Sequence, residues 1–319
     1  MVILIDTGKD YHLKAILLEL MPILERYGKK GPDLILCTHY DFDHIGSLDK
    51  IVERFHLHTK NFWMHKTHQL IRIAERLEPL LDGSGLFLPD EDAEILHVQQ
   101  GGIIDYADDD IQDLLQNLFH EKEVLRMMER LGIDPVEPIY NRCSLEGWPE
   151  IKVLGPTLEY YNELFPEHFD WGGYLESEKS ELTTRKETDV PEGATAFERL
   201  DNWIRSALTA TNRNSAIVLI ETVQGKFLFA ADAGIESFQR IPDYKTVLTD
   251  VHFLKVPHHG SANNLNTELI QLMNPDIAFI SGKKHLSPLV VDALRLQGTT
   301  VLTTLEEGRT LQYPLSPKE

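Results

Sequence analysis

The chain has 319 residues, 42% of them hydrophobic and 26% charged, and a formal net charge of -20. This length is enough for one large or two ordinary domains with an ample core, and the composition is typical of globular proteins. No apolar run approaches the roughly 20 residues of a membrane-spanning helix, and the N-terminus has no secretory pattern. Two cysteines are too few for a disulfide framework. We therefore expect a cytoplasmic protein that does not enter a membrane.

The negative charge is concentrated in the middle of the chain. Residues 66–200 contain 30 acidic and 12 basic side chains and carry -18, whereas all other residues together carry -2. A separate acidic module or insertion is the simplest explanation of this distribution.

The first 65 residues predict alternating strands and helices. Short apolar runs predict strands at 1–6, 33–37 and 61–65, and apolar residues at helical spacing predict helices at 13–27 and 47–56.

A helical, acidic segment follows at 66–149. Its clearest helix is expected from Asp110 to Gly132, where apolar side chains recur along one side. Residues 172–195 are polar and aperiodic and predict a mobile loop.

The second half of the chain is rich in strands. They are predicted at 151–156, 215–221, 226–232, 251–257, 276–281, 299–304 and 309–314, with a helix at 287–297 before the last two. Strands in both halves with helices between them favour two sheets packed together under outer helices.

The stretch THYDFDHIG (38–46) contains four potential metal ligands: His39, Asp41, Asp43 and His44. It lies between a predicted strand and a predicted helix, and open sheets bind ligands at the carboxyl ends of their strands. A turn that caps the helix would explain one aspartate but not the H-x-D-x-D-H alternation. We therefore expect a metal site here.

Two other strand ends carry residues of the same kind. The strand FLFAAD ends in Asp232, and FLKVPHHGS ends in the pair His258 and His259. His285 follows the strand DIAFIS, so it projects from the same edge; the alternative is a residue at the start of the next helix.

Together these motifs resemble the metallo-β-lactamase-fold hydrolases, and most of all the hydrolase domain of the ComEC-type competence proteins. LIDTG (4–8), NRNSAIVL (212–219) and AADAG (230–234) fit the same series in the same order. The resemblance implies an α+β fold, the four-layer αββα sandwich. Its two parts would be residues 1–65 and 150–319, separated by the acidic helical insertion 66–149.

The resemblance also implies two divalent metal ions, zinc or manganese. His39 and Asp41 would hold the first, Asp43 and His44 the second, and Asp232 would bridge them.

His259 would complete the second site, with His258 facing the substrate phosphate, although the two could exchange roles. Asp43, His258 and His285 are the expected catalytic residues. Asp6 would orient a metal ligand.

The chain departs from the wider family in ways that affect these expectations. Asp41 replaces a histidine, and Asn212 and Asn214 stand near the place of another histidine ligand. Oxygen-rich sites suit manganese or magnesium better than all-histidine sites do. The family also begins with a hairpin before LID, here residues 4–6. Either a protein partner covers that edge strand or the true start lies upstream.

The expected function is metal-dependent hydrolysis of a phosphodiester, such as DNA, by a water that two metal ions activate. The acidic segment makes a long polyanion a difficult substrate, because nucleic-acid binding depends on Lys and Arg. A small phosphodiester or nucleotide signal, with 66–149 as a lid, is one alternative. The other is an effector subunit whose acidic segment docks a partner.

Overall fold

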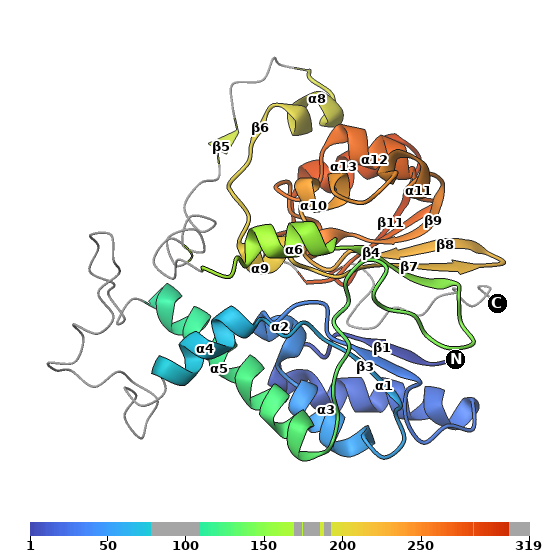
Figure 1. Ribbon diagram of the computed structural model, residues 1–319. Coiled ribbons are helices and arrows are strands. Elements are labelled where there is room, and N and C mark those ends of the chain that lie inside the picture. Colours follow the sequence, from blue (N-terminus) through green and yellow to red (C-terminus); the bar gives the residue numbers. More distant parts are fainter. Residues whose placement is uncertain (78–108, 169–173, 175–185, 188–192, 283, 306–319) are drawn as a thin grey trace, which may run out of the picture. The chain divides into compact units, whose positions relative to one another are not determined.

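The computed structural model describes residues 1–77, 109–168, 174, 186–187, 193–282 and 284–305 (Figure 1). The chain divides into two compact units. Unit 1 comprises Met1–Pro138 and Glu159–Lys179, and unit 2 comprises Ile139–Leu158 and Ser180–Glu319.

Unit 1 is built on a parallel sheet. Its strands, in the order β1-β2-β3, are Ile3–Ile5, Leu34–Leu36 and Asn61–Trp63. All residues of β2 are buried, as expected for the central strand of a parallel sheet covered by helices. Among the described residues β1 pairs only with β2, so it is an edge strand.

Helices α1 and α3 lie on one side of this sheet (Figure 1). Helix α3 buries its Leu48, Ile51, Val52 and Phe55, the apolar face that the sequence predicts. The helices of unit 1 are η1 (Asp10–His12), α1 (Leu13–Arg26), α2 (Phe42–Ile45), α3 (Leu48–Phe55), α4 (His68–Leu77), α5 (Asp109–Arg130) and α6 (Leu158–Leu164).

Unit 2 contains a six-stranded sheet in the order β11-β10-β9-β8-β7-β4. Strands β8 to β11 are parallel, and β7 runs antiparallel to both of its neighbours, β4 and β8. The strands are β4 (Ile151–Gly155), β7 (Ile217–Thr222), β8 (Gly225–Phe229), β9 (Val251–Lys255), β10 (Ile277–Ile280) and β11 (Thr300–Thr303); β5 (Lys186–Glu187) and β6 (Trp203–Ile204) form a separate pair.

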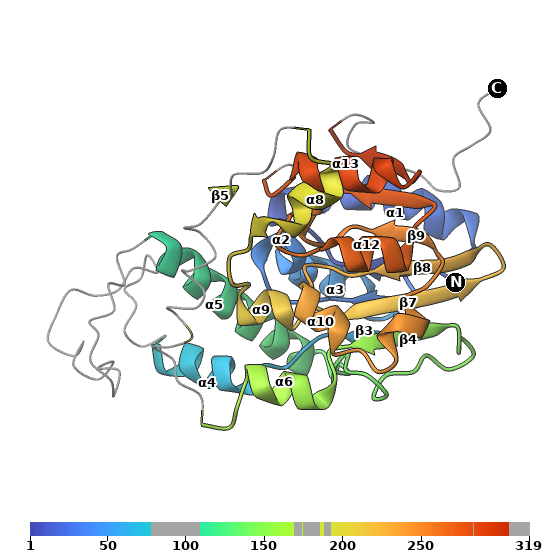
Figure 2. The same ribbon diagram turned by 90° about the horizontal axis from the view of Figure 1, so that it is seen from above.

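Helices α12 and α13 cover one face of this sheet in both views (Figures 1 and 2). The core of the unit joins their buried leucines and valines to the inner residues of the strands, such as Leu219, Leu228 and Leu254. The helices of unit 2 are α8 (Ala196–Asp201), α9 (Ala210–Arg213), α10 (Ile235–Gln239), α11 (Tyr244–Val247), η4 (Pro257–Gly260), α12 (Thr267–Met273) and α13 (Pro288–Leu296).

The α+β class is confirmed, since helices and two main sheets are mixed along the chain. The four-layer αββα arrangement and the proposed domain boundaries stay predictions. The strand expected at 309–314 and most of the loop expected at 172–195 lie outside the described residues. The short helices α9 to α12 were not predicted.

Helix α5, from the expected insertion, belongs to unit 1 and packs against α2, α3 and α4. Its Leu115, Leu118, Val124 and Met128 are buried. The fully buried Glu121 accepts the backbone N–H of Thr67 at 3.3 Å, and its burial raises the pKa of this carboxyl to about 8. Glu121 is therefore protonated at neutral pH.

The first prediction concerns this carboxyl. Because the folded-state pKa is about 8 and the ordinary value is 4.5, the folded chain holds a proton that the unfolded chain releases. The free energy of unfolding should fall as pH rises from 4.5 to 8. Glu121→Gln removes this dependence. The free energy of unfolding of the variant should therefore exceed that of wild type by a difference that grows with pH, to at most about 4 kcal/mol at pH 8.

Urea unfolding at pH 5 and at pH 8 measures the effect. Glu123→Gln, an exposed position two residues further along α5, is the matched control and should follow wild type. Equal pH profiles for Glu121→Gln and wild type would contradict the raised pKa.

Candidate metal centre

The expected metal ligands of unit 1, and Asp6 with them, lie at the carboxyl edge of its sheet. The parallel strands β1 and β2 end at Ile5 and Leu36. Asp6 follows β1 directly, and Thr38-His39 follow β2 after Cys37. Neighbouring strands are about 4.8 Å apart, so side chains that follow adjacent parallel strands can contact each other.

The Asp6 carboxylate connects these strand ends. Its Oδ1 accepts the backbone N–H of Thr38 at 2.8 Å and the Thr38 hydroxyl at 2.9 Å, and its Oδ2 lies 2.8 Å from His44 Nδ1. Asp6 itself has a φ of 58°, in the left-handed region. Hydrogen bonding at Nδ1 orients the His44 ring so that Nε2 is its cation-binding nitrogen.

The H-x-D-x-D-H residues gather around this ring. The His39 and His44 ring centroids are 4.0 Å apart, and both residues are buried. His39 Nε2 lies 3.6 Å from Asp41 Oδ2, and His44 Nε2 lies 3.9 Å from Asp43 Oδ2. Ligand atoms about 2.0–2.2 Å from one ion are roughly 3–4 Å apart, so these pairs have a spacing that fits a divalent metal.

Unit 2 holds its expected ligands on turns with unusual backbone angles. Ala231, His258 and His259 have φ values of 46°, 45° and 54°. The His258 N–H donates to the Ala231 carbonyl at 2.9 Å, which joins the turn after β9 to the turn after β8. Left-handed backbone at non-glycine residues is costly and concentrates at functional sites.

The side chains of this turn are also fixed. Asn264 donates to the Asp232 carbonyl at 2.8 Å, and its Oδ1 lies 3.1 Å from His258 Nδ1. With Nδ1 occupied, His258 Nε2 lies 3.7 Å from Asp232 Oδ2, again a spacing that suits two ligands of one ion.

His259 is fixed by a different contact. Its Nδ1 donates to the Ser281 carbonyl at 2.8 Å. Gly282 has a φ of 72°, and a Cβ there would lie 3.0 Å from His259 Nδ1, so only glycine fits this close approach.

His285 joins the histidines of unit 2. Its ring centroid is 4.3 Å from that of His258 and 6.2 Å from that of His259. Burial and, after it, the neighbouring His258 lower the pKa of His285 to about 3. Lys284 is exposed beside it, and Lys283 lies outside the described residues.

Each unit thus brings its own expected site residues together, at the carboxyl edge of its sheet. The sequence did not indicate Thr38, Asn264 or Ser281, which hold the ligands through hydrogen bonds and carry no motif of their own. Asn212 and Asn214, at the end of α9, are both buried.

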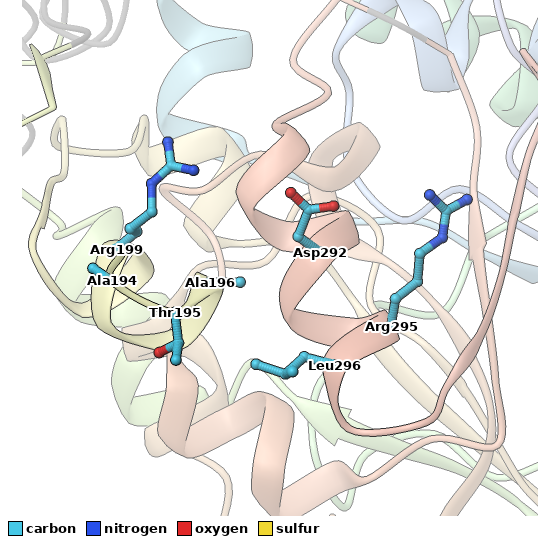
Figure 3. A pocket seen from close by; sticks show the side chains of 7 residues that line it. All are labelled: Ala194, Thr195, Ala196, Arg199, Asp292, Arg295 and Leu296. Carbon is cyan, nitrogen blue, oxygen red and sulfur yellow. The ribbon is translucent and has the colours of Figure 1, made fainter. Parts of the chain in front are cut away.

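Two cavities of unit 2 do not contain these residues. One of about 500 Å³ is lined by Thr195 and Arg199 on the α8 side and by Asp292 and Arg295 of α13 (Figure 3). The other, of about 560 Å³, lies against β4 and β7 and includes Cys143. Neither lining includes an expected ligand, so we do not assign the reaction to them.

Residues 2–110 match the family model described as Metallo-beta-lactamase superfamily. These residues are therefore similar to the proteins of this superfamily, whose members are mostly hydrolases and typically bind divalent metals, often zinc. The matched residues extend past 65 into the segment expected to be an insertion. No curated protein matches the chain. None of the described helices is long and apolar enough to cross a membrane.

The second prediction tests the Asp6 contacts. Asp6→Asn keeps a residue that tolerates positive φ but replaces one acceptor oxygen by an amide, so Thr38 and His44 can no longer both be satisfied. We expect the affinity for a divalent metal to fall about 10- to 100-fold, the usual effect of removing a partner of a metal ligand.

Titration of the metal-free protein against a chromogenic chelator measures this affinity. Asp33→Asn is the matched control, because Asp33 also accepts a backbone N–H, that of Val2 at 2.7 Å, but lies before β2. If Asp6→Asn and Asp33→Asn lost the same metal affinity, the effect would be a general one on folding and would contradict a specific role of Asp6.

Proposed function

We propose that the protein is a metal-dependent phosphodiesterase, related to the ComEC-type hydrolases, with a nucleic acid or a smaller phosphodiester as substrate. The observation that carries the proposal is the Asp6–His44 hydrogen bond, which orients an imidazole beside the carboxylates of Asp41 and Asp43. This carboxylate–histidine pairing is typical of metal sites.

The proposed centre is the one that the resemblance implies. His39 and Asp41 would hold one ion, Asp43, His44 and His259 would hold the other, and Asp232 would be a ligand of both. The support is that the unit 1 ligands have spacings suited to a cation, and that Asp232 and His259 follow strands at the carboxyl edge of their own sheet.

When bound, two divalent ions supply a nucleophilic hydroxide from water and stabilise negative charge on the phosphate oxygens. The chain's own residues then position the substrate. His258, whose Nδ1 Asn264 fixes, presents Nε2 to a phosphate oxygen, and His285 packs against its ring. The reaction needs no side-chain nucleophile.

The acidic charge of 66–200 bears on the choice of substrate. Repulsion from a segment of -18 adds over every phosphate within a Debye length of about 8–10 Å, so it disfavours long DNA more than a small diester. A small phosphodiester or a nucleotide signal is therefore the second candidate. Assays on linear DNA, circular DNA and bis(p-nitrophenyl) phosphate distinguish the two.

The third prediction concerns the metal. Because Asp41 and the buried Asn212 and Asn214 stand where imidazoles are usual, the centre is rich in oxygen donors. Metal-free protein given Mn²⁺ should hydrolyse bis(p-nitrophenyl) phosphate at least as fast as protein given Zn²⁺. Activity that only zinc restores would contradict this expectation.

The fourth prediction is that Asp43→Ala/His44→Ala abolishes both hydrolysis and binding of the second ion, because two of its ligands are removed. Elemental analysis and the diester assay measure the two effects. The control is Asp276→Ala/His252→Ala, which removes another Asp–His pair, 2.8 Å apart, near the beginnings of β10 and β9. A double variant that retained two metals per chain would contradict the assignment.

A further inference from the structure

Helix α2 carries two of the proposed metal ligands, Asp43 and His44, yet it is only four residues long. A helix of this length has little stability of its own, because its backbone hydrogen bonds are few: the N–H groups of His44 and Ile45 bond to the Asp41 carbonyl, and that of Gly46 to the Phe42 carbonyl. What holds α2 therefore determines where these two ligands lie.

The usual capping contact is missing at the start of α2. Asp41 occupies the N-cap position, where an aspartate normally accepts a backbone N–H from the first turn, but its side chain makes no cap hydrogen bond. Its carboxylate instead lies 3.6 Å from His39 Nε2. The residue that would cap the helix is thus placed as a ligand.

Helix α5 supplies the missing contact. Asn117 Oδ1 accepts the backbone N–H of Phe42, the first residue of α2, at 3.1 Å. His120 Nε2 lies 3.3 Å from the carbonyl oxygen of Ile45, the last residue of α2, and must donate because a carbonyl only accepts. The His120 ring also meets the Phe42 ring edge-on, with centroids 5.6 Å apart.

These contacts come from a firmly held part of α5. Asn117 and His120 are three positions apart and so lie on one face of the helix. Leu115 and Leu118, on either side of Asn117, are each 2% exposed, and Glu121 bonds to Thr67 after β3. The face of α5 that contacts α2 is therefore fixed to the core of unit 1.

We propose that Asn117 and His120 are positioning residues: they clamp both ends of α2 and so set the geometry of Asp43 and His44, while Asp41 remains available to bind metal. The inference rests on the proposed function for its metal site, but the clamp itself is independent of it. Helix α5 would then position metal ligands, in addition to any role of the segment 66–149 as a lid.

Two pairs of variants test the clamp. Asn117→Leu and His120→Leu remove the acceptor and the donor at similar size, whereas Asn117→Asp and His120→Gln keep them. Gln116→Leu on α5 and His68→Leu on α4 are controls at exposed positions.

The first measurement is hydrogen exchange of the metal-free protein. Loss of one cap should speed exchange in the peptide 38–47 about fivefold, with peptides from β2 and α3 unchanged. The second is Mn²⁺ affinity, which should fall about tenfold in the leucine variants and recover in Asn117→Asp and His120→Gln. Thermal midpoints should shift by only a few degrees.

The outcomes separate the two proposals. Faster exchange at 38–47 together with weaker Mn²⁺ binding supports the inference. Unchanged exchange, or faster exchange with unchanged affinity, overturns it and leaves the proposed function intact. A wild-type protein that binds no Mn²⁺ overturns the proposed function and the metal role of the clamp, and the exchange data still decide whether α5 holds α2.

Discussion

The hydrogen bonds of the Asp6 carboxylate are the constraint on which the ligand turn of unit 1 depends. One side chain joins the end of β1 to Thr38 after β2 and to His44 in α2. A carboxylate can do this only where two parallel strands end side by side, because its oxygens reach no further than neighbouring strands. The positive φ of Asp6 indicates that the backbone accepts a costly conformation to make these contacts.

Unit 2 follows the same physical principle with different residues. Its turns after β8 and β9 are strained at Ala231, His258 and His259, and the Asn264 side chain joins them through Asp232 and His258. In each unit another polar residue fixes the orientation of an expected site histidine: Asp6 that of His44, and Asn264 that of His258. Precise placement of donors before a metal arrives lowers the cost of binding it, which is why such supporting contacts matter for affinity.

Much of the fold and of the candidate site could be predicted from the sequence, because the sequence signals for them are local. The apolar runs around 33–37 and 251–257 gave the strands, the helical spacing near 110–132 gave α5, and H-x-D-x-D-H gave the ligand turn. Among the supporting residues, the resemblance implied the role of Asp6. The role of Asn117 could not be predicted, since Asn117 lies 75 positions from Phe42 and no periodicity links them. Nor does any local pattern show that Glu121, on an acidic helix, is fully buried.

The central claim is that the expected ligands hold a pair of divalent ions. Crystals of the Mn²⁺-loaded protein, measured at the manganese absorption edge, test it most directly. The account predicts two anomalous peaks about 3.5–4 Å apart, both within bonding distance of Asp232, one beside Asp41 and the other beside His44 and His259. Manganese bound elsewhere, or only one bound ion, would contradict it.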